Sequence, residues 1–194
     1  MSFKKYLNQQ EGPSIVYTFG RFNPMHEEHY LLTKDLLNYK KKNKVDDAVV
    51  YTSFAQNQKK NPLSPGDKIM FLRKMVPNGV SVSDDQSLKN SYNILEDLIK
   101  NKKYTKIIFI VGEDRVRDFQ GMIKYAKQWG EEAGTFVDFK IQQRKGNRSS
   151  QYSGTRMREL VKAGDFENFK KALPRSLQSS AEDIFEKVKV GLGV

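Results

Sequence analysis

Apolar and polar positions along the chain fall into two alternating patterns. Short runs rich in β-branched and aromatic residues are typical of strands, and longer stretches with apolar residues three or four positions apart are typical of amphipathic helices. Because the two patterns alternate, they predict a parallel sheet, and the run at 107–111 is apolar on both faces, as a strand covered on both sides requires. Strands are predicted at 15–19, 48–52, 80–82, 107–111 and 136–141, and helices around 30–37, 69–75, 94–99 and 115–129.

The last third of the chain changes to helices alone. Gly164 ends one helical stretch, Asp165 can cap the next, and Pro174 stops it. Ser179 and Glu182 have the spacing of a capping box before a final helix. We therefore predict an α/β fold of one domain over residues 1–194: a Rossmann-like parallel sheet of about five strands with helices on both faces (about 13–163), followed by a helical C-terminal appendage (about 164–190).

Composition excludes several classes of protein. The chain has no cysteine, which rules out a disulfide framework and a thiolate metal site, and no run approaches the 18 apolar residues of a membrane span. We expect a cytoplasmic protein without a membrane partner. The net charge of +11, from 34 basic and 23 acidic residues, favours polyanionic partners such as nucleotides, phosphates or nucleic acid, although most of the lysines are expected to be simply solvated.

The segment from Gly20 to His29 follows the first predicted strand and carries the first candidate chemistry. In open α/β sheets ligands bind at the carboxyl ends of strands, so this position suits a site. Gly20 permits a turn close to a ligand, while Asn23 and Pro24 suit the N-cap and the first position of a helix. His26 and His29, the only two histidines, would then share one face of the first turns, beside helix amide groups that favour anions. The segment predicts a phosphate site.

A zinc site is one alternative for a histidine pair, and a surface pair without a function is another. The chain has neither a cysteine nor a third histidine to complete a zinc shell, and the spacing is one residue shorter than the His-Glu-x-x-His of zinc proteases. We therefore assign no metal ligand in the protein. Two unrelated histidines would seldom fall at this spacing directly after a strand and a glycine turn.

A second basic segment, Ser153-Gly154-Thr155-Arg156-Met157-Arg158, opens a helix after a polar loop. Its hydroxyl groups can cap the helix or face a ligand, and its arginines can hold phosphates by paired hydrogen bonds. Taken alone, an ordinary capped basic helix explains this segment better than a site does.

The two segments together resemble the T/HxGH nucleotidyltransferase superfamily, which includes nicotinamide-mononucleotide, phosphopantetheine and glycerol-phosphate nucleotidyltransferases. The Gly-Arg-Phe-Asn-Pro stretch matches its first strand and turn, and Ser-Gly-Thr-x-x-Arg is close to its second signature, Ile-Ser-Ser-Thr-x-Ile-Arg. The Asn-Pro-x-His-x-x-His order also resembles ATP sulfurylases. The resemblance covers nearly the whole chain and is greatest to small cytidylyltransferase-like proteins encoded by bacteriophages, which would place the protein in the host cytoplasm.

The resemblance implies a role for each matching residue. His26 and His29 would bind the α- and β-phosphates of a nucleoside triphosphate, Arg158 would complete the catalytic set, and Mg²⁺ would bridge the phosphates. The side chain of Arg156 is expected to be exposed. The nucleotide-binding residues would be Gly20, Arg21, Phe22, Asn23, Gly112, Asp114, Ser153, Gly154 and Thr155, and the acceptor-binding residues would be Lys60 and Arg115.

Several of these positions also have an ordinary structural explanation. Phe22 suits the core, Asp114 could cap a helix, and Lys60 could be a solvated loop lysine. Glu28 stands where the superfamily usually has glycine, and a carboxylate near a triphosphate is unfavourable unless it points away or meets a metal ion. A glutamate in the first turn of a helix also complements the helix dipole. Glu28 therefore leaves the choice of nucleotide open.

The function predicted from these residues is transfer of a nucleoside monophosphate from ATP or CTP to a small phosphorylated acceptor, with release of pyrophosphate. Adenylyl transfer to nicotinamide mononucleotide is the specific reaction that we expect. Cytidylyl transfer to a phosphorylated small molecule is the first alternative, and a sulfurylase-like reaction is the next. A non-catalytic protein that binds nucleotides or nucleic acid is a separate alternative. No pattern fixes the number of copies, and we expect a homo-oligomer.

Overall fold

The computed structural model describes residues 12–112, 115–144 and 152–194. Within them lies a five-stranded sheet in the order β3-β2-β1-β4-β5, and every neighbouring pair is parallel. This confirms the predicted α/β class. The strand order is that of a doubly wound sheet, in which the chain adds strands outward from β1, first on the β2 side and then on the β4 side. The strands are β1 (Ser14–Gly20), β2 (Asp47–Thr52), β3 (Ser81–Val82), β4 (Lys106–Val111) and β5 (Asp138–Gln143).

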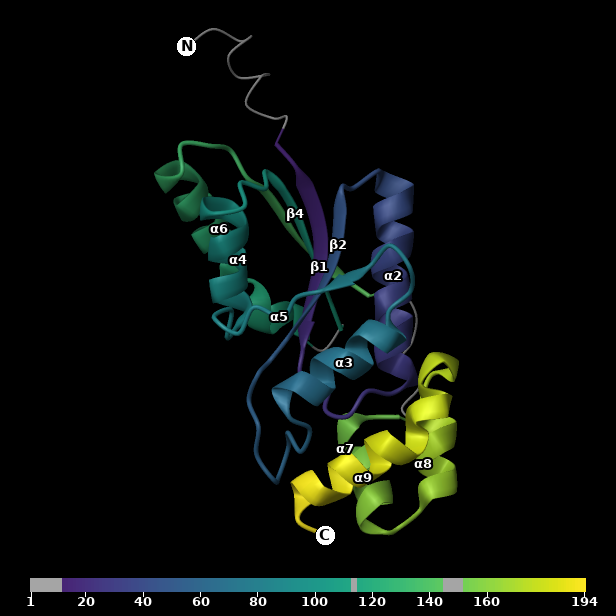
Figure 1. The fold of residues 1–194 in the computed structure, drawn as a ribbon. Coiled ribbons are helices and arrows are strands. Elements are labelled where there is room, and N and C mark those ends of the chain that lie inside the picture. The colour runs from purple at the N-terminus through teal and green to yellow at the C-terminus, as the bar shows by residue number, and fades with distance from the viewer. Residues whose placement is uncertain (1–11, 113–114, 145–151) are drawn as a thin grey trace, which may run out of the picture.

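Helices cover both faces of the sheet, and a separate helical group lies at the carboxyl ends of the strands (Figure 1). Among the described residues, every helix is too short or too polar to cross a membrane. The helices beside the sheet are α2 (Glu27–Asn43), α3 (Pro65–Met75), α4 (Ser91–Lys100), α5 (Val116–Phe119) and α6 (Met122–Glu132). The C-terminal group is α7 (Gly154–Lys162), α8 (Phe166–Ala172), the 3-10 helix η3 (Arg175–Ser180) and α9 (Ala181–Leu192).

The core consists of two apolar clusters on opposite faces of the sheet. Alternate residues of β1 divide between them: Ile15 and Tyr17 pack with α4 and α6, while Val16 packs with α2, α3 and the C-terminal helices. The Tyr17 ring stacks on Phe109 of β4 with centroids 4.6 Å apart. Burial of each such side chain contributes about 1.5–3 kcal/mol to the stability of the fold. These contacts therefore stabilise the pairing of β1 with β4.

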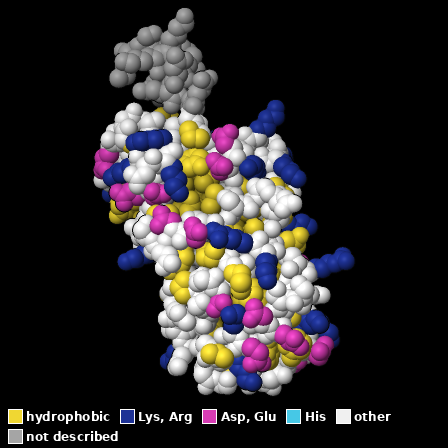
Figure 2. Space-filling view, in the orientation of Figure 1, with side chains coloured by type: hydrophobic (Ala, Val, Ile, Leu, Met, Phe, Trp, Pro, Cys, Tyr) yellow, Lys and Arg dark blue, Asp and Glu magenta, His cyan; other side chains and the backbone are white. Residues whose placement is uncertain are grey.

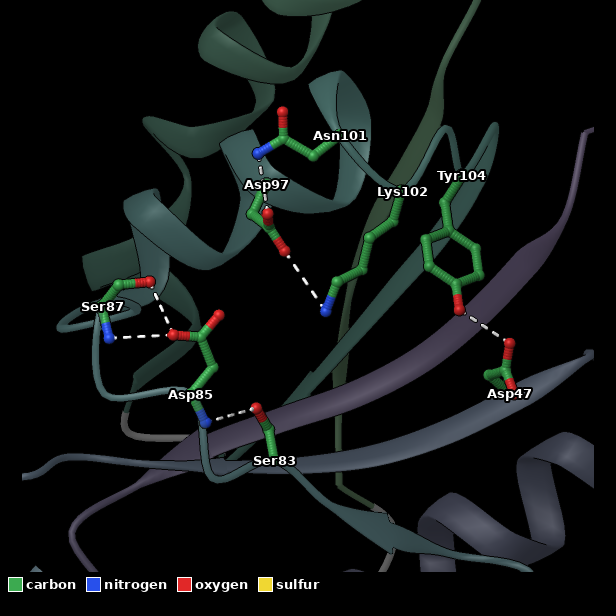
Figure 3. A network of polar contacts seen from close by, with 8 residues as sticks. All are labelled: Asp47, Ser83, Asp85, Ser87, Asp97, Asn101, Lys102 and Tyr104. Atoms are coloured by element: carbon green, nitrogen blue, oxygen red, sulfur yellow. Dashed lines mark hydrogen bonds and ion pairs between the residues drawn. The ribbon is translucent and has the colours of Figure 1, made fainter.

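Polar contacts fix the loops on either side of α4 (Figure 3). The Asp85 carboxylate accepts hydrogen bonds from the Ser87 backbone N–H at 2.9 Å and from its hydroxyl at 2.6 Å, which closes the turn after β3. Asp97 of α4 pairs with Lys102 at 3.3 Å before β4 begins. The hydroxyl of Tyr104, in the loop after α4, donates to Asp47 of β2 at 2.7 Å and so ties that loop to the sheet.

Three sequence predictions of element boundaries are wrong. The helix predicted over 115–129 is divided into α5 and α6 next to Gly121, a residue with low helix propensity. The strand predicted at 136–141 lies at 138–143, because Asp138 pairs with Lys106 and leaves Phe136 exposed. The capping box does not form, because Ser179 lies inside η3 and α9 begins directly after it. The predicted cap at Asp165 is confirmed, since its carboxylate accepts from the Asn168 backbone N–H at 3.2 Å.

Candidate active site

The segment that carries both histidines begins where β1 ends, beside the end of β2. Gly20 is paired with Thr52, and the backbone N–H of Ser53 donates to the Gly20 carbonyl at 3.0 Å. A Cβ atom at Gly20 would lie 2.9 Å from the Phe22 ring, so this turn requires glycine. Phe22 has a φ of 46°, is buried, and packs on the His29 ring at a centroid distance of 4.7 Å. It occupies the core position that the sequence also allowed.

The predicted start of the first helix is wrong. Asn23 is not its N-cap and Pro24 is not its first residue; the Asn23–Pro24 peptide bond is cis, and α2 begins at Glu27 with His26 at the N-cap position. The Asn23 side chain instead binds the backbone of Leu63: Oδ1 accepts from its N–H at 2.9 Å, and Nδ2 donates to its carbonyl at 3.4 Å. An Asn side chain can form hydrogen bonds with backbone groups outside a helix as well as with those at a helix start, and here its partner is a loop far away in the sequence.

The two imidazole rings are brought together as the sequence predicted. Their centroids lie 3.8 Å apart at an interplanar angle of 35°. His26 is buried and His29 is partly exposed, so the pair lies at the border of the core and solvent. Because His26 is the N-cap of a helix of 17 residues, the amide groups of the first turn lie next to it and favour negative charge.

Arg158 of α7 joins three segments that are far apart in the sequence. Its Nη1 donates to the Asn23 carbonyl at 2.9 Å and to the Lys60 carbonyl at 3.4 Å, and its Nη2 donates to the Thr155 hydroxyl at 3.1 Å. Burial lowers the pKa of Arg158, and the nearby positive charge of Arg21 lowers it further. Two cations held close together are relieved by an anion, so this pair favours a phosphate group.

The second basic segment starts α7 against the first. The Ser153 hydroxyl caps the helix by accepting from the Arg156 backbone N–H at 3.1 Å. A Cβ atom at Gly154 would lie 3.3 Å from Nη1 of Arg158 and 3.6 Å from the Asn23 carbonyl oxygen, so glycine allows the close approach. Arg156 is exposed, as predicted, and lies 3.8 Å from a carboxylate one turn along the helix.

Glu28 is buried and paired, through a partner that the sequence analysis missed. Its carboxylate lies 2.8 Å from Nη1 of Arg144, the residue directly after β5, and Nε of Arg144 lies 3.5 Å from Asp35. The carboxylate is thus neutralised by a cation inside the protein. One signal was present in the sequence: Glu28 and Asp35 are seven residues apart, which places them on one face of α2.

The other predicted site residues have varied surroundings. The side chain of Lys60 is exposed, and only its carbonyl meets Arg158. Gly112 directly follows β4, and its carbonyl accepts from the Arg115 backbone N–H at 3.0 Å. The Arg115 side chain pairs with its neighbour Asp118 at 2.8 Å on the α5 side of the sheet. Asp114 lies outside the described residues.

Lys68 is a second residue that the sequence analysis missed. It lies on α3, is 0% exposed, and donates a hydrogen bond from Nζ to the Ser53 carbonyl at the end of β2. Burial lowers its pKa from 10.5 to about 8. The buried ammonium group thus contacts Ser53, the residue whose backbone N–H donates to the Gly20 carbonyl.

Comparison with known proteins places this geometry in a family. The family model described as cytidylyltransferase-like matches residues 17–180. A nicotinamide-nucleotide adenylyltransferase from Methanolobus tindarius is 26% identical over 174 residues, which cover 87% of this chain and 88% of that protein. Two solved structures share the fold with a TM-score of 0.51 each. They are a structure described as a nicotinate-nucleotide adenylyltransferase from Vibrio parahaemolyticus (16% identity, 93% of this chain and 97% of that one) and Thermotoga maritima TmcAL bound with alpha-thio ATP (13% identity). This chain spans 56% of the TmcAL chain. The protein is a nucleotidyltransferase of the cytidylyltransferase-like family.

Proposed function

We propose that the protein transfers the adenylyl group of ATP to nicotinamide mononucleotide and releases pyrophosphate. The observation that carries the proposal is the convergence of His26, His29 and Arg158 at the carboxyl end of β1, beside the start of α2. The similarity to a nicotinamide-nucleotide adenylyltransferase over most of both chains supports this choice of substrates. The internal pairing of Glu28 with Arg144 supports it as well, because it removes the electrostatic objection to a bound triphosphate.

In the proposed reaction, a phosphate oxygen of the acceptor attacks the α-phosphorus of ATP. A new oxygen–phosphorus bond forms while the bond from the α-phosphorus to the bridging oxygen of the β-phosphate breaks, and pyrophosphate leaves with that electron pair. His26 and His29 hold the α- and β-phosphate oxygens, and Arg158 with Arg21 stabilises the leaving group. No protein nucleophile takes part, since this class of reaction depends on positioning and charge stabilisation.

Magnesium enters this scheme as part of the substrate. Within the described residues, no group of three or more histidine or carboxylate side chains could hold a metal ion. Mg²⁺ commonly keeps several water ligands and binds through substrate phosphates, so Mg²⁺-ATP fits a site that is built from cations and amide groups. The ion would neutralise part of the charge that develops on the phosphates.

The reaction is tested by measuring pyrophosphate release with Mg²⁺ while ATP, CTP, GTP and UTP are each combined with a panel of phosphorylated acceptors led by nicotinamide mononucleotide. We expect turnover with ATP and nicotinamide mononucleotide. Turnover with CTP and another phosphorylated acceptor, but not with ATP and nicotinamide mononucleotide, would contradict the proposal and support the in-family alternative, cytidylyl transfer. No turnover with any pair would contradict the proposal.

The histidine assignment has its own variant. We expect His29→Ala to keep the circular dichroism spectrum and the melting temperature of the unaltered protein and to lose about 10²–10³ in turnover, the range for removal of one preorganised donor. Asn43→Ala is the matched control, because Asn43 is an exposed residue at the opposite end of the same helix. An unchanged turnover rate in His29→Ala would contradict the assignment of His29 as a catalytic residue.

Nucleic-acid binding is a separate prediction from the net charge of +11. On the face seen in Figure 2, Lys and Arg side chains are spread out and interspersed with Asp and Glu, which does not favour a continuous basic track on that face. Binding that falls steeply with salt and is indifferent to both histidines would support it. The expected homo-oligomer and kinship with phage-encoded proteins also stay predictions.

A further inference from the structure

Lys68 is a charged residue on a helix face that is otherwise apolar. The other buried residues of α3 are Ile69, Phe71, Leu72 and Met75, and all of them belong to the core. The Lys68 side chain is 0% exposed and is among the largest fully buried side chains of the described residues. Lysine is rarely buried to this extent unless it is paired with an acidic group.

The surroundings of Lys68 do not compensate its charge. Its Nζ donates to the carbonyl oxygen of Ser53, and within the described part of the chain no carboxylate forms an ion pair with it. Its lowered pKa has burial as its cause, with no contribution from a neighbouring charge. A buried cation with one neutral partner destabilises the fold, and an apolar side chain of similar length would pack in its place without that cost. Packing alone therefore does not explain a lysine here.

The contacts of Lys68 lead to the histidine segment. Ser53, whose carbonyl binds Nζ, donates its own N–H to the Gly20 carbonyl at 3.0 Å. The preceding residue, Thr52, donates its hydroxyl to the Arg21 carbonyl at 3.4 Å. Residues 52–53 thus hold the turn from which His26 and His29 follow, and the ammonium group holds residue 53.

We propose that Lys68 is a positioning residue for nucleotidyl transfer: its buried ammonium group fixes Ser53, and through Ser53 it fixes the Gly20–Arg21 turn against which the phosphates bind. The proposal rests on the proposed function for the reaction that it serves. A positioning role accounts for the contact between the Lys68 ammonium group and Ser53, the residue that directly follows β2.

The test compares Lys68→Met, which keeps the unbranched stem and removes the charge, with Lys68→Arg, which keeps a charged donor. Lys74→Met is the matched control, because Lys74 is an exposed lysine on the same helix and its loss changes the net charge equally. Unfolding in urea, ATP binding by calorimetry, and kcat and KM for ATP are measured for each. We expect Lys68→Met to be at least as stable as the unaltered protein while kcat falls about 10- to 100-fold, the scale of a misplacement of about 1 Å. Lys68→Arg should recover part of the rate, and Lys74→Met should match the unaltered protein.

Two results would overturn the proposal. If Lys68→Met keeps kcat and ATP affinity within twofold of the unaltered protein, the ammonium group positions nothing. If Lys68→Met loses stability and turnover together and Lys68→Arg restores neither, the lysine is a packing residue. Failure of the proposed function gives a different result, because the unaltered protein would then neither bind ATP nor release pyrophosphate from it. In that case the positioning role of Lys68 would be contradicted as well.

Discussion

The buried ammonium group of Lys68 makes a prediction about stability that is independent of catalysis. In the unfolded chain this lysine has its ordinary pKa of 10.5, whereas in the folded protein burial lowers the pKa to about 8. Below pH 8 both states carry the proton, so the folded protein bears the full cost of a buried charge. Between about pH 8 and 10.5 the unfolded chain binds more protons than the folded one, so stability rises with pH in this window. Above it, the cost is absent.

The size of the effect follows from the two pKa values. The gap between 10.5 and about 8 corresponds to about 3 kcal/mol at about 1.4 kcal/mol per pH unit. Replacement by methionine removes this cost at pH 7 and also removes the hydrogen bond to the Ser53 carbonyl, a loss of about 1 kcal/mol. Lys68→Met should therefore be about 2 kcal/mol more stable than the unaltered protein at pH 7, which is about 4–8 °C in melting temperature. The advantage should be gone at pH 10.5.

Urea denaturation followed by circular dichroism at pH 7, 8, 9 and 10 measures this difference directly. The tyrosines and the remaining lysines are the same in Lys68→Met and in the unaltered protein, so their contributions to the pH dependence of stability cancel in the comparison. Lys74→Met, which loses an exposed lysine of the same helix, should follow the unaltered protein in parallel at every pH. A difference between Lys68→Met and the unaltered protein that stays constant from pH 7 to 10 would refute the argument, because Lys68 would then have an ordinary pKa.

Three further predictions concern packing and pairing. Glu28→Gln should lower the free energy of unfolding in urea by about 3 kcal/mol, the low end for a broken buried pair, because Arg144 keeps a second carboxylate at 3.5 Å. Adding Arg144→Met should recover most of that loss, and a double variant no more stable than the single one would contradict the pairing. Gly191→Ala would bring a Cβ atom to 2.1 Å from the Pro62 carbonyl oxygen, so thermal melting should show a loss of about 1–3 kcal/mol. Ser153→Ala removes the cap of α7 and should cost about 1 kcal/mol in the same assay; no loss would mean that the hydroxyl does not cap.

The central strands and the fold class could be predicted because helices cover β1 and β4, whose residues are almost all buried. The run Ile107–Val111 is buried along its whole length in β4, and such a run shows in the sequence as unbroken hydrophobicity. The meeting of the two histidines could be predicted as well, because their spacing is local to one helix turn. The end of β5 and the break before α6 were missed, since hydrogen-bond register and one glycine set those boundaries rather than hydrophobicity.

The contacts that assemble the site could not be predicted from local preference. Asn23 is a good helix cap in isolation, yet its amide binds the backbone of Leu63, 40 residues away. Arg144 pairs with Glu28 across 116 residues, and no periodicity links the two. The position of Lys68 could have been recognised in the sequence, because it lies four residues before Leu72 and therefore shares the inward face of α3. A lysine on an apolar helix face is the signal that would have found it.

The site combines features that each disfavour the protein without a ligand. Burial lowers the pKa of Arg158 and the positive charge of Arg21 lowers it further, whereas burial alone lowers the pKa of Lys68. We expect a bound polyphosphate to relieve the cost at Arg21 and Arg158, because it would bring negative charge between two cations. The folded state should then gain stability when a nucleotide binds, by an amount that grows with its concentration over its dissociation constant. If the proposed function holds, the stability lost by placing Arg21 beside Arg158 would be recovered as affinity for a triphosphate, while the carboxylate of Glu28 is already paired with Arg144.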